Sequence, residues 1–128
     1  MTPDNVTNLD GGFWLIWRKV KPLLEKALKR SNEYSMSDVL HFAYSGMWQM
    51  WHGDNSVAFT RIANYPQHKA LIILLAAGEL EEIIDLEPHV ARWGRNQGCK
   101  YVEIYGRRGW SRALPGYDEQ AAIFRKVL

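Results

Sequence analysis

The chain has 128 residues, 47% of them apolar, which is enough for one compact domain with a substantial core. Sixteen basic and fourteen acidic side chains leave a net charge of +2, too small by itself to indicate a nucleic-acid partner. The single cysteine, Cys99, excludes an internal disulfide, and one cysteine with four scattered histidines matches no zinc-binding spacing. We therefore expect one domain in a reducing compartment, with no metal.

Residues 1–12 form a polar leader that lacks the basic start and apolar core of a signal peptide. The longest apolar run, residues 70–77, is far shorter than the roughly 20 residues that span a bilayer. We expect neither export nor a membrane span, and we place the single domain at residues 13–128. Six tryptophans and six tyrosines favour a surface for protein partners, because these side chains add contact area at low entropic cost.

Two helices are expected first along the chain. Apolar residues recur every three or four positions, which predicts a helix from about 13 to 30 that begins or kinks near Pro22. Ser35 or Ser37 can cap a second, shorter helix, and Gly46 is placed to end it in a left-handed conformation. The residues expected on the apolar faces are Phe13, Ile16, Trp17, Val20, Leu24, Ala27, Leu28, Val39, Leu40, Phe42 and Ala43.

Strands and one more long helix follow. Residues 47–51 and 57–62 predict a hairpin around Gly53-Asp54-Asn55, and residues 71–77 are apolar on both faces, as in a covered central strand. A helix then runs from Leu80 toward Gly98, in one or two segments because of Pro88. Residues 101–105 predict a strand, residues 110–114 one helical turn, and residues 122–128 a last strand.

Nucleophile and acid–base motifs are not evident. His52 and Asp54 flank a glycine in ordinary hairpin-turn chemistry, so we interpret them as turn residues. Ser56, Ser111 and Cys99 match no nucleophile motif, and Cys99 is expected to be a small buried side chain.

The order of elements, together with three short motifs, resembles the GNAT superfamily of N-acyltransferases. The motifs are a helix that ends at Gly98-Cys99, the strand around Val102 and Ile104, and Gly116-Tyr117 before the last segment. The resemblance implies an α/β (α+β) fold in a single domain: two N-terminal helices, a mixed and mostly antiparallel central sheet, and a helix after the central strand. The family's first strand has no counterpart in the polar leader.

The resemblance also implies a coenzyme A site, and here the chain departs from the family. The family binds the cofactor's pyrophosphate on a glycine-rich basic loop at the start of the helix after the central strand. In this chain that stretch is Ala76-Ala77-Gly78-Glu79-Leu80-Glu81-Glu82, with one glycine and no basic residue. Acidic side chains stabilise a helix start but occupy the position that an anion needs. We therefore expect no cofactor, and acetyl-coenzyme A only if the site is non-standard.

The candidate site residues follow from the same comparison. Family members often use a tyrosine on the helix after the Gly-Cys strand as general acid, and Tyr105 and Tyr117 flank that region. Their alternative role is to pack at sheet edges with the hydroxyl exposed to water. A non-standard phosphate site could use Arg92, Arg95, Arg107 and Arg108.

Residues 88–112 are locally basic and contain four aromatic residues. Arg107, Arg108, Trp110 and Arg112 are the candidate partner-binding residues. They could hold phosphate or stack on bases, but stacking on their own aromatic neighbours or a protein interface is favoured. The opposite charges of residues 79–87 and 92–112 also favour association between copies.

The Arg107–Arg112 segment and the tryptophan-rich hairpin resemble those of small GNAT-like proteins of tailed phages and prophages. The resemblance implies a non-catalytic protein that acts through protein contacts, in the host cytoplasm or as a virion-associated component. Its expected partners are a second copy or virion proteins. The alternatives are a small N-acyltransferase with a non-standard acetyl-coenzyme A site and a nucleic-acid-binding module.

Overall fold

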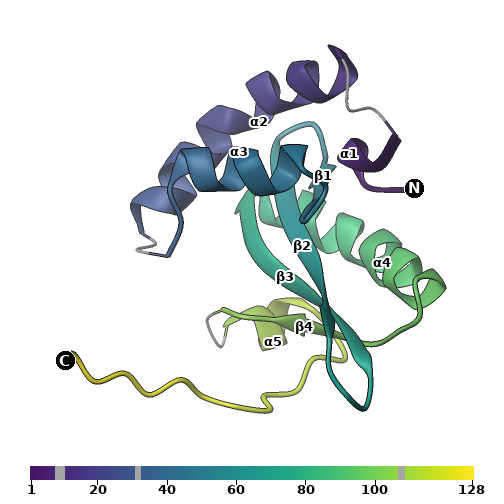
Figure 1. The fold of residues 1–128 in the computed structure, drawn as a ribbon, viewed down its shortest axis with the longest axis vertical. Coiled ribbons are helices and arrows are strands. Elements are labelled where there is room, and N and C mark those ends of the chain that lie inside the picture. Colours follow the sequence, from purple (N-terminus) through teal and green to yellow (C-terminus); the bar gives the residue numbers. More distant parts are fainter. Residues whose placement is uncertain (8–10, 31–32, 107–108) are drawn as a thin grey trace.

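The computed structural model describes residues 1–7, 11–30, 33–106 and 109–128. The described residues form a four-stranded sheet with helices on both faces (Figure 1). The elements are α1 (Asp4–Thr7), α2 (Gly11–Lys29), α3 (Met36–Tyr44), β1 (Gln49–His52), β2 (Ser56–Asn64), β3 (Lys69–Gly78), α4 (Leu80–Asn96), β4 (Cys99–Ile104) and α5 (Gly109–Ala113). The single mixed α+β domain expected from the sequence is therefore confirmed.

The strands lie in the order β1-β2-β3-β4. The first three pair antiparallel, and β4 pairs parallel with β3. One apolar core fills the space between the sheet and helices α2 and α3, and a second lies between the sheet and α4. The central strand β3 is therefore covered on both faces, as its continuous apolar sequence predicted.

Both N-terminal helices form as predicted. Pro22 lies inside α2, so the helix does not begin there, and Pro88 lies inside α4, which is one segment. Both prolines occupy exposed positions. Ser35, one of the two alternatives, caps α3 through a capping box with Asp38. Gly46 follows the end of that helix with φ +80°, as expected.

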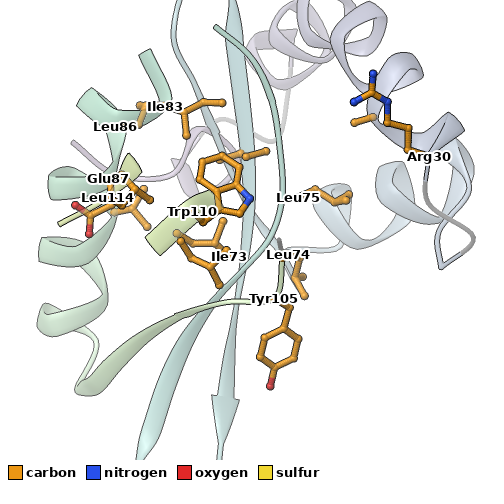
Figure 2. Close-up of a pocket in the computed structure, with 16 residues that line it drawn as sticks. Arg30, Ile73, Leu74, Leu75, Ile83, Leu86, Glu87, Tyr105, Trp110 and Leu114 are labelled. Atoms are coloured by element: carbon orange, nitrogen blue, oxygen red, sulfur yellow. The ribbon is translucent and has the colours of Figure 1, made fainter. Parts of the chain in front are cut away.

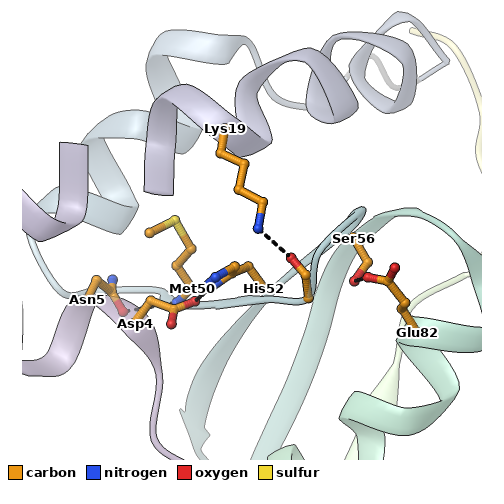
Figure 3. Close-up of polar contacts among 8 residues, drawn as sticks. Asp4, Asn5, Lys19, Met50, His52, Ser56 and Glu82 are labelled. Atoms are coloured by element: carbon orange, nitrogen blue, oxygen red, sulfur yellow. Dashed lines mark hydrogen bonds and ion pairs between the residues drawn. The ribbon is translucent and has the colours of Figure 1, made fainter. Parts of the chain in front are cut away.

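The polar leader contributes a short helix and a buried side chain. Asn5 is 2% exposed, and its amide nitrogen donates to the carbonyls of Ala43 and Trp48, both at 2.6 Å. Its amide oxygen accepts from the backbone N–H of Met50 at 3.0 Å (Figure 3). Beside it, Asp4 Oδ2 lies 2.6 Å from His52 Nδ1. These polar contacts attach α1 to β1, and the apolar pattern of the sequence could not reveal them.

The strand predicted at residues 122–128 is wrong. Residues 117–128 are extended, but they belong to no strand of the sheet. Figure 1 shows this yellow segment running from α5 past the sheet to the C-terminus. Its apolar side chains lie in solvent: Phe124 is 93% exposed and Ile123 is 85% exposed. The apolar residues of this segment favoured a strand, but the structure gives it no partner strand.

Candidate functional site

A groove opens where β3 and β4 separate. The last paired residues of these two strands are Ile73 and Ile104, and β3 continues to Gly78 paired with β2 but no longer with β4. The groove has a volume of about 340 Å³ (Figure 2). Its lining is mostly apolar and comes from α2, β2, β3, α4, β4 and the segment around α5: Ala27, Arg30, Ala58, Ile73, Leu74, Leu75, Ala76, Ile83, Leu86, Glu87, Val90, Ile104, Tyr105, Gly106, Trp110 and Leu114.

Helix α5 contributes the largest aromatic side chain of the groove. The indole of Trp110 lies between the side chains of α4 and those of β3 in Figure 2. A Cβ atom added to Gly106 would lie 2.8 Å from Trp110 Cδ1, so the glycine leaves room for the ring. The half-buried side chain of Trp110 lines the groove, and its partner-binding role stays a prediction.

The start of α4 is bound tightly to the β1–β2 turn. Gly78 has φ +106°, and a Cβ atom there would overlap the carbonyl oxygen of Asn55. The next residue, Glu79, donates its backbone N–H to that same oxygen at 2.9 Å. Only glycine fits this close backbone approach, which fixes where the helix begins.

Glu82 completes the same contact. Its Oε1 accepts hydrogen bonds from the Asn55 backbone N–H and from Ser56 Oγ, both at 2.8 Å. These two bonds lower the pKa of Glu82, and its carboxylate in turn raises the pKa of Glu79. Figure 3 shows the Ser56–Glu82 pair joining β2 to α4. Glu82 is therefore a structural acceptor for the hairpin.

The residues at this helix start do not fit a pyrophosphate. Glu79, Glu81 and Glu82 lie at or beside the first turn, where a phosphate would need the backbone N–H groups and positive charge. Of these N–H groups, that of Glu79 is already bonded to Asn55. Coenzyme A bound in the family's usual mode would place like charges side by side.

The two candidate tyrosines lie in different environments. Tyr105 is exposed at the groove, and its hydroxyl is 3.4 Å from that of Tyr65, a contact that raises the pKa of Tyr105. Tyr117 donates its hydroxyl to Glu87 Oε1 at 2.9 Å. Burial and the neighbouring carboxylate raise the pKa of Tyr117 far above its ordinary value. Tyr117 is thus held as a hydrogen-bond donor, whereas Tyr105 borders the groove with its hydroxyl directed away from it, toward Tyr65 (Figure 2).

Among the candidate arginines that the structure describes, none lines the groove. Arg92 and Arg95 are exposed on the second half of α4, and Arg112 is exposed on α5. Arg107 and Arg108 lie outside the described residues. The sequence missed Arg30, from the end of α2, which lies on the groove lining (Figure 2). Its only sequence signal was a basic residue after an amphipathic helix, which is common at helix ends.

The described residues contain neither a metal-binding cluster nor a membrane-spanning helix. No cluster of three or more histidine, cysteine, aspartate or glutamate side chains there is placed to hold a metal ion. Among the helices in these parts of the chain, none is long and apolar enough to cross a membrane.

Comparison with known proteins identifies the fold. No protein family profile and no curated protein sequence matches the chain. Among solved structures, it is similar to TTHA1254 from Thermus thermophilus (16% identity, TM-score 0.60, 87% of this chain and 92% of that one). It is also similar to the aminoglycoside acetyltransferase meta-AAC0020 from an uncultured soil metagenomic sample (12%, 0.63, 89% of each chain).

A third similar structure is a GNAT family acetyltransferase from Staphylococcus aureus subsp. aureus USA300_TCH1516, with 11% identity and a TM-score of 0.61. That match covers 93% of this chain and 94% of the other. At such low identities the comparisons show the fold alone. The chain has a GNAT-like fold.

Proposed function

We propose that this protein is a non-catalytic member of the GNAT-like fold that acts through protein contacts. The observation that carries the proposal is the start of α4, where Glu82 holds Asn55 and Ser56 in the place of a phosphate-binding loop. A helix start that binds an anion needs unpaired N–H groups and positive charge. Here carboxylates lie at that position and Glu82 holds the hairpin, and both features disfavour a bound pyrophosphate.

An exposed aromatic surface supports the same proposal. Trp14 on α2 is 44% exposed and Tyr44 at the end of α3 is 48% exposed, and their ring centroids are 5.5 Å apart. Leu15 and Met47 are more exposed still. Aromatic residues and methionine are enriched at protein interfaces, and exposed apolar patches commonly mark such sites.

The proposal also includes a phage or prophage origin and a location in the host cytoplasm or the virion. It is supported by the resemblance of the Arg107–Arg112 segment and the tryptophan-rich hairpin to phage GNAT-like proteins. The partners would then be a second copy of the chain or virion proteins.

The test is turnover of acetyl-coenzyme A with a panel of amines. We expect a rate equal to that without protein. A rate above this background that is lost in Ala76→Phe, which would fill the groove, would overturn the proposal. Leu15→Ala, an exposed position on α2, is the matched control because it leaves the groove unchanged.

One observation favours a second candidate, a small N-acyltransferase with a non-standard cofactor site. The groove remains open where β3 and β4 separate, with Arg30 and Tyr105 on its lining. In that candidate Tyr105 would be the general acid, and Arg30, Arg92 or Arg95 would hold phosphate away from the acidic helix start. The turnover assay decides between the two. No described contact favours the nucleic-acid alternative.

A further inference from the structure

The two outer edges of the sheet, on β1 and on β4, differ in their hydrogen bonding. On the outer edge of β1, the amide of Asn5 bonds both the N–H of Met50 and the carbonyl of Trp48, as a neighbouring strand would. The outer edge of β4 pairs with no strand among the described residues. Unpaired edges expose a row of N–H and C=O groups that can accept another strand. One edge is therefore covered and the other is available.

The same chain carries an extended segment that suits such an edge. Residues 121–128 contain six apolar residues and belong to no helix or strand, and four apolar side chains there are 85% exposed or more: Ile123, Phe124, Val127 and Leu128. Soluble proteins rarely leave so many neighbouring apolar side chains in water without a partner. The segment thus has the features of a donor strand.

The side chain of Glu103 on β4 sets the register. Its Oε1 is buried and has no hydrogen-bond partner in the described part of the chain. Directly opposed residues of an antiparallel pair share one face, so placing Arg125 opposite Glu103 gives the buried oxygen a charged donor. The same register places Phe124 opposite Ile104, and Ile123 opposite Tyr105. These apolar side chains then meet apolar or aromatic ones, as does Val127 opposite Tyr101, whereas Leu128 lies opposite Lys100.

We propose that residues 121–128 of one copy add to the β4 edge of a second copy as an antiparallel strand. Contacts of the chain's own segment favour a second copy as the acceptor. Tyr117 is bonded to Glu87 on α4, and Arg125 is bonded to Glu33, beyond the end of α2, at 2.9 Å. These contacts attach the segment to α4 and to Glu33, and it pairs with no described strand of its own sheet. Reciprocal exchange between two copies would pair both strands and close a symmetric dimer.

This inference deepens the proposed function, on which it rests, by naming a second copy as one protein partner. It predicts that mass measured by light scattering after size exclusion corresponds to two chains for the unchanged protein. Glu103→Arg and Arg125→Glu should each give one chain, because each places like charges opposite one another in both strand pairs of a homodimer.

Mixing the two variants is the decisive test. In a mixed dimer, Arg125 of one chain meets Glu103 of the other, and the introduced Glu at 125 meets the introduced Arg at 103. Both pairs are attractive, so two monomeric variants should form a dimer when combined. Pairing of the segment with its own β4 cannot produce this result.

Gln120→Ala, which precedes the proposed strand, is the control and should remain a dimer. An unchanged protein with the mass of one chain at its highest soluble concentration would overturn the inference. So would a mixture that stays monomeric while circular dichroism shows both variants folded. If a variant does not fold, hydrogen exchange of the unchanged protein is the test. The β4 amides should exchange more slowly at protein concentrations at which the dimer forms. Exchange at these amides that does not depend on protein concentration would contradict the inference. Acetyl transfer by a dimer would contradict only the non-catalytic function.

Discussion

Ser56 Oγ donates a hydrogen bond to Glu82 Oε1 over 2.8 Å, which joins the first residue of β2 to the first turn of α4. Ser56 is fully buried, so the carboxylate satisfies a polar group that would otherwise be unpaired in the interior. The acidic run that the sequence presented as an obstacle to coenzyme A therefore includes a structural residue. A carboxylate is needed at position 82 because both Asn55 and Ser56 donate hydrogen bonds to it.

The pH dependence of stability should report this contact. The hydrogen bonds from Asn55 and Ser56 lower the pKa of Glu82 in the folded protein. A group with a lowered folded pKa contributes stability above its unfolded pKa and loses it as pH falls through the folded pKa. We expect Glu82→Gln to reduce the acid sensitivity of the melting temperature. Unchanged acid sensitivity between wild type and variant would contradict the assignment.

Gly78→Ala should destabilise the protein strongly. A Cβ atom at Gly78 would overlap the Asn55 carbonyl oxygen, and φ is +106°, so the expected loss is about 3 kcal/mol or more of unfolding free energy. Gly46→Ala is the matched control, because Gly46 also has a positive φ but meets no atom within 4 Å. It should cost only about 1 kcal/mol in urea denaturation. Equal losses would show that the close approach is unimportant.

Asn5→Ala should release α1 from the sheet. The substitution removes hydrogen bonds to Trp48 and Met50 on the β1 edge, and we expect a loss of about 2 to 3 kcal/mol. Chemical denaturation measures this loss, and faster hydrogen exchange at the Met50 amide would localise it. An unchanged unfolding free energy would mean that α1 does not protect the edge.

Replacement of Asp4, which precedes Asn5 in α1, should affect stability differently from replacement of Asn5. Burial raises the pKa of Asp4 despite its contact with His52. When folding raises the pKa of a carboxyl group, that group's contribution to stability is fully present below the unfolded pKa. The contribution is lost as pH rises through the folded pKa. Asp4→Asn should therefore match or exceed the wild-type melting temperature at neutral pH. A marked decrease would show that the Asp4–His52 ion pair outweighs burial.

Tyr117→Phe tests the position of a candidate catalytic residue. Its hydroxyl is bonded to Glu87, and burial and that carboxylate raise its pKa strongly. Loss of the bond should cost about 1 kcal/mol. An alkaline phase should also disappear from the tyrosine absorbance titration. If the titration is unchanged, the hydroxyl of Tyr117 is not held as the structure indicates.

Periodicity and turn chemistry predicted most of the fold. The apolar spacing that begins at Phe13 located α2, and the continuous apolar run around Ile73 located the central strand, because both patterns follow from which faces are buried. Gly98-Cys99 correctly marked the end of α4 and the start of β4. Pro22 and Pro88 left the start of α2 and the continuity of α4 open, because a proline inside a helical pattern can begin, kink or end a helix.

The site was harder to predict because it depends on contacts between distant segments. Glu82 meets Ser56 only after the hairpin and α4 have packed together, and Asn5 meets Met50 only after α1 has docked. Neither pair has a spacing signal. The final segment was misassigned because its pattern can indicate extended chain but cannot supply the neighbouring strand that would bury Phe124.

Isothermal titration of the protein with coenzyme A tests the central claim most directly. The acidic start of α4 and the use of Glu82 by Asn55 and Ser56 predict no saturable heat, even at millimolar ligand. Ala76→Phe, which fills the groove, should give the same trace as wild type. A saturable one-site isotherm in the wild type that is lost in Ala76→Phe would contradict the account and favour the N-acyltransferase.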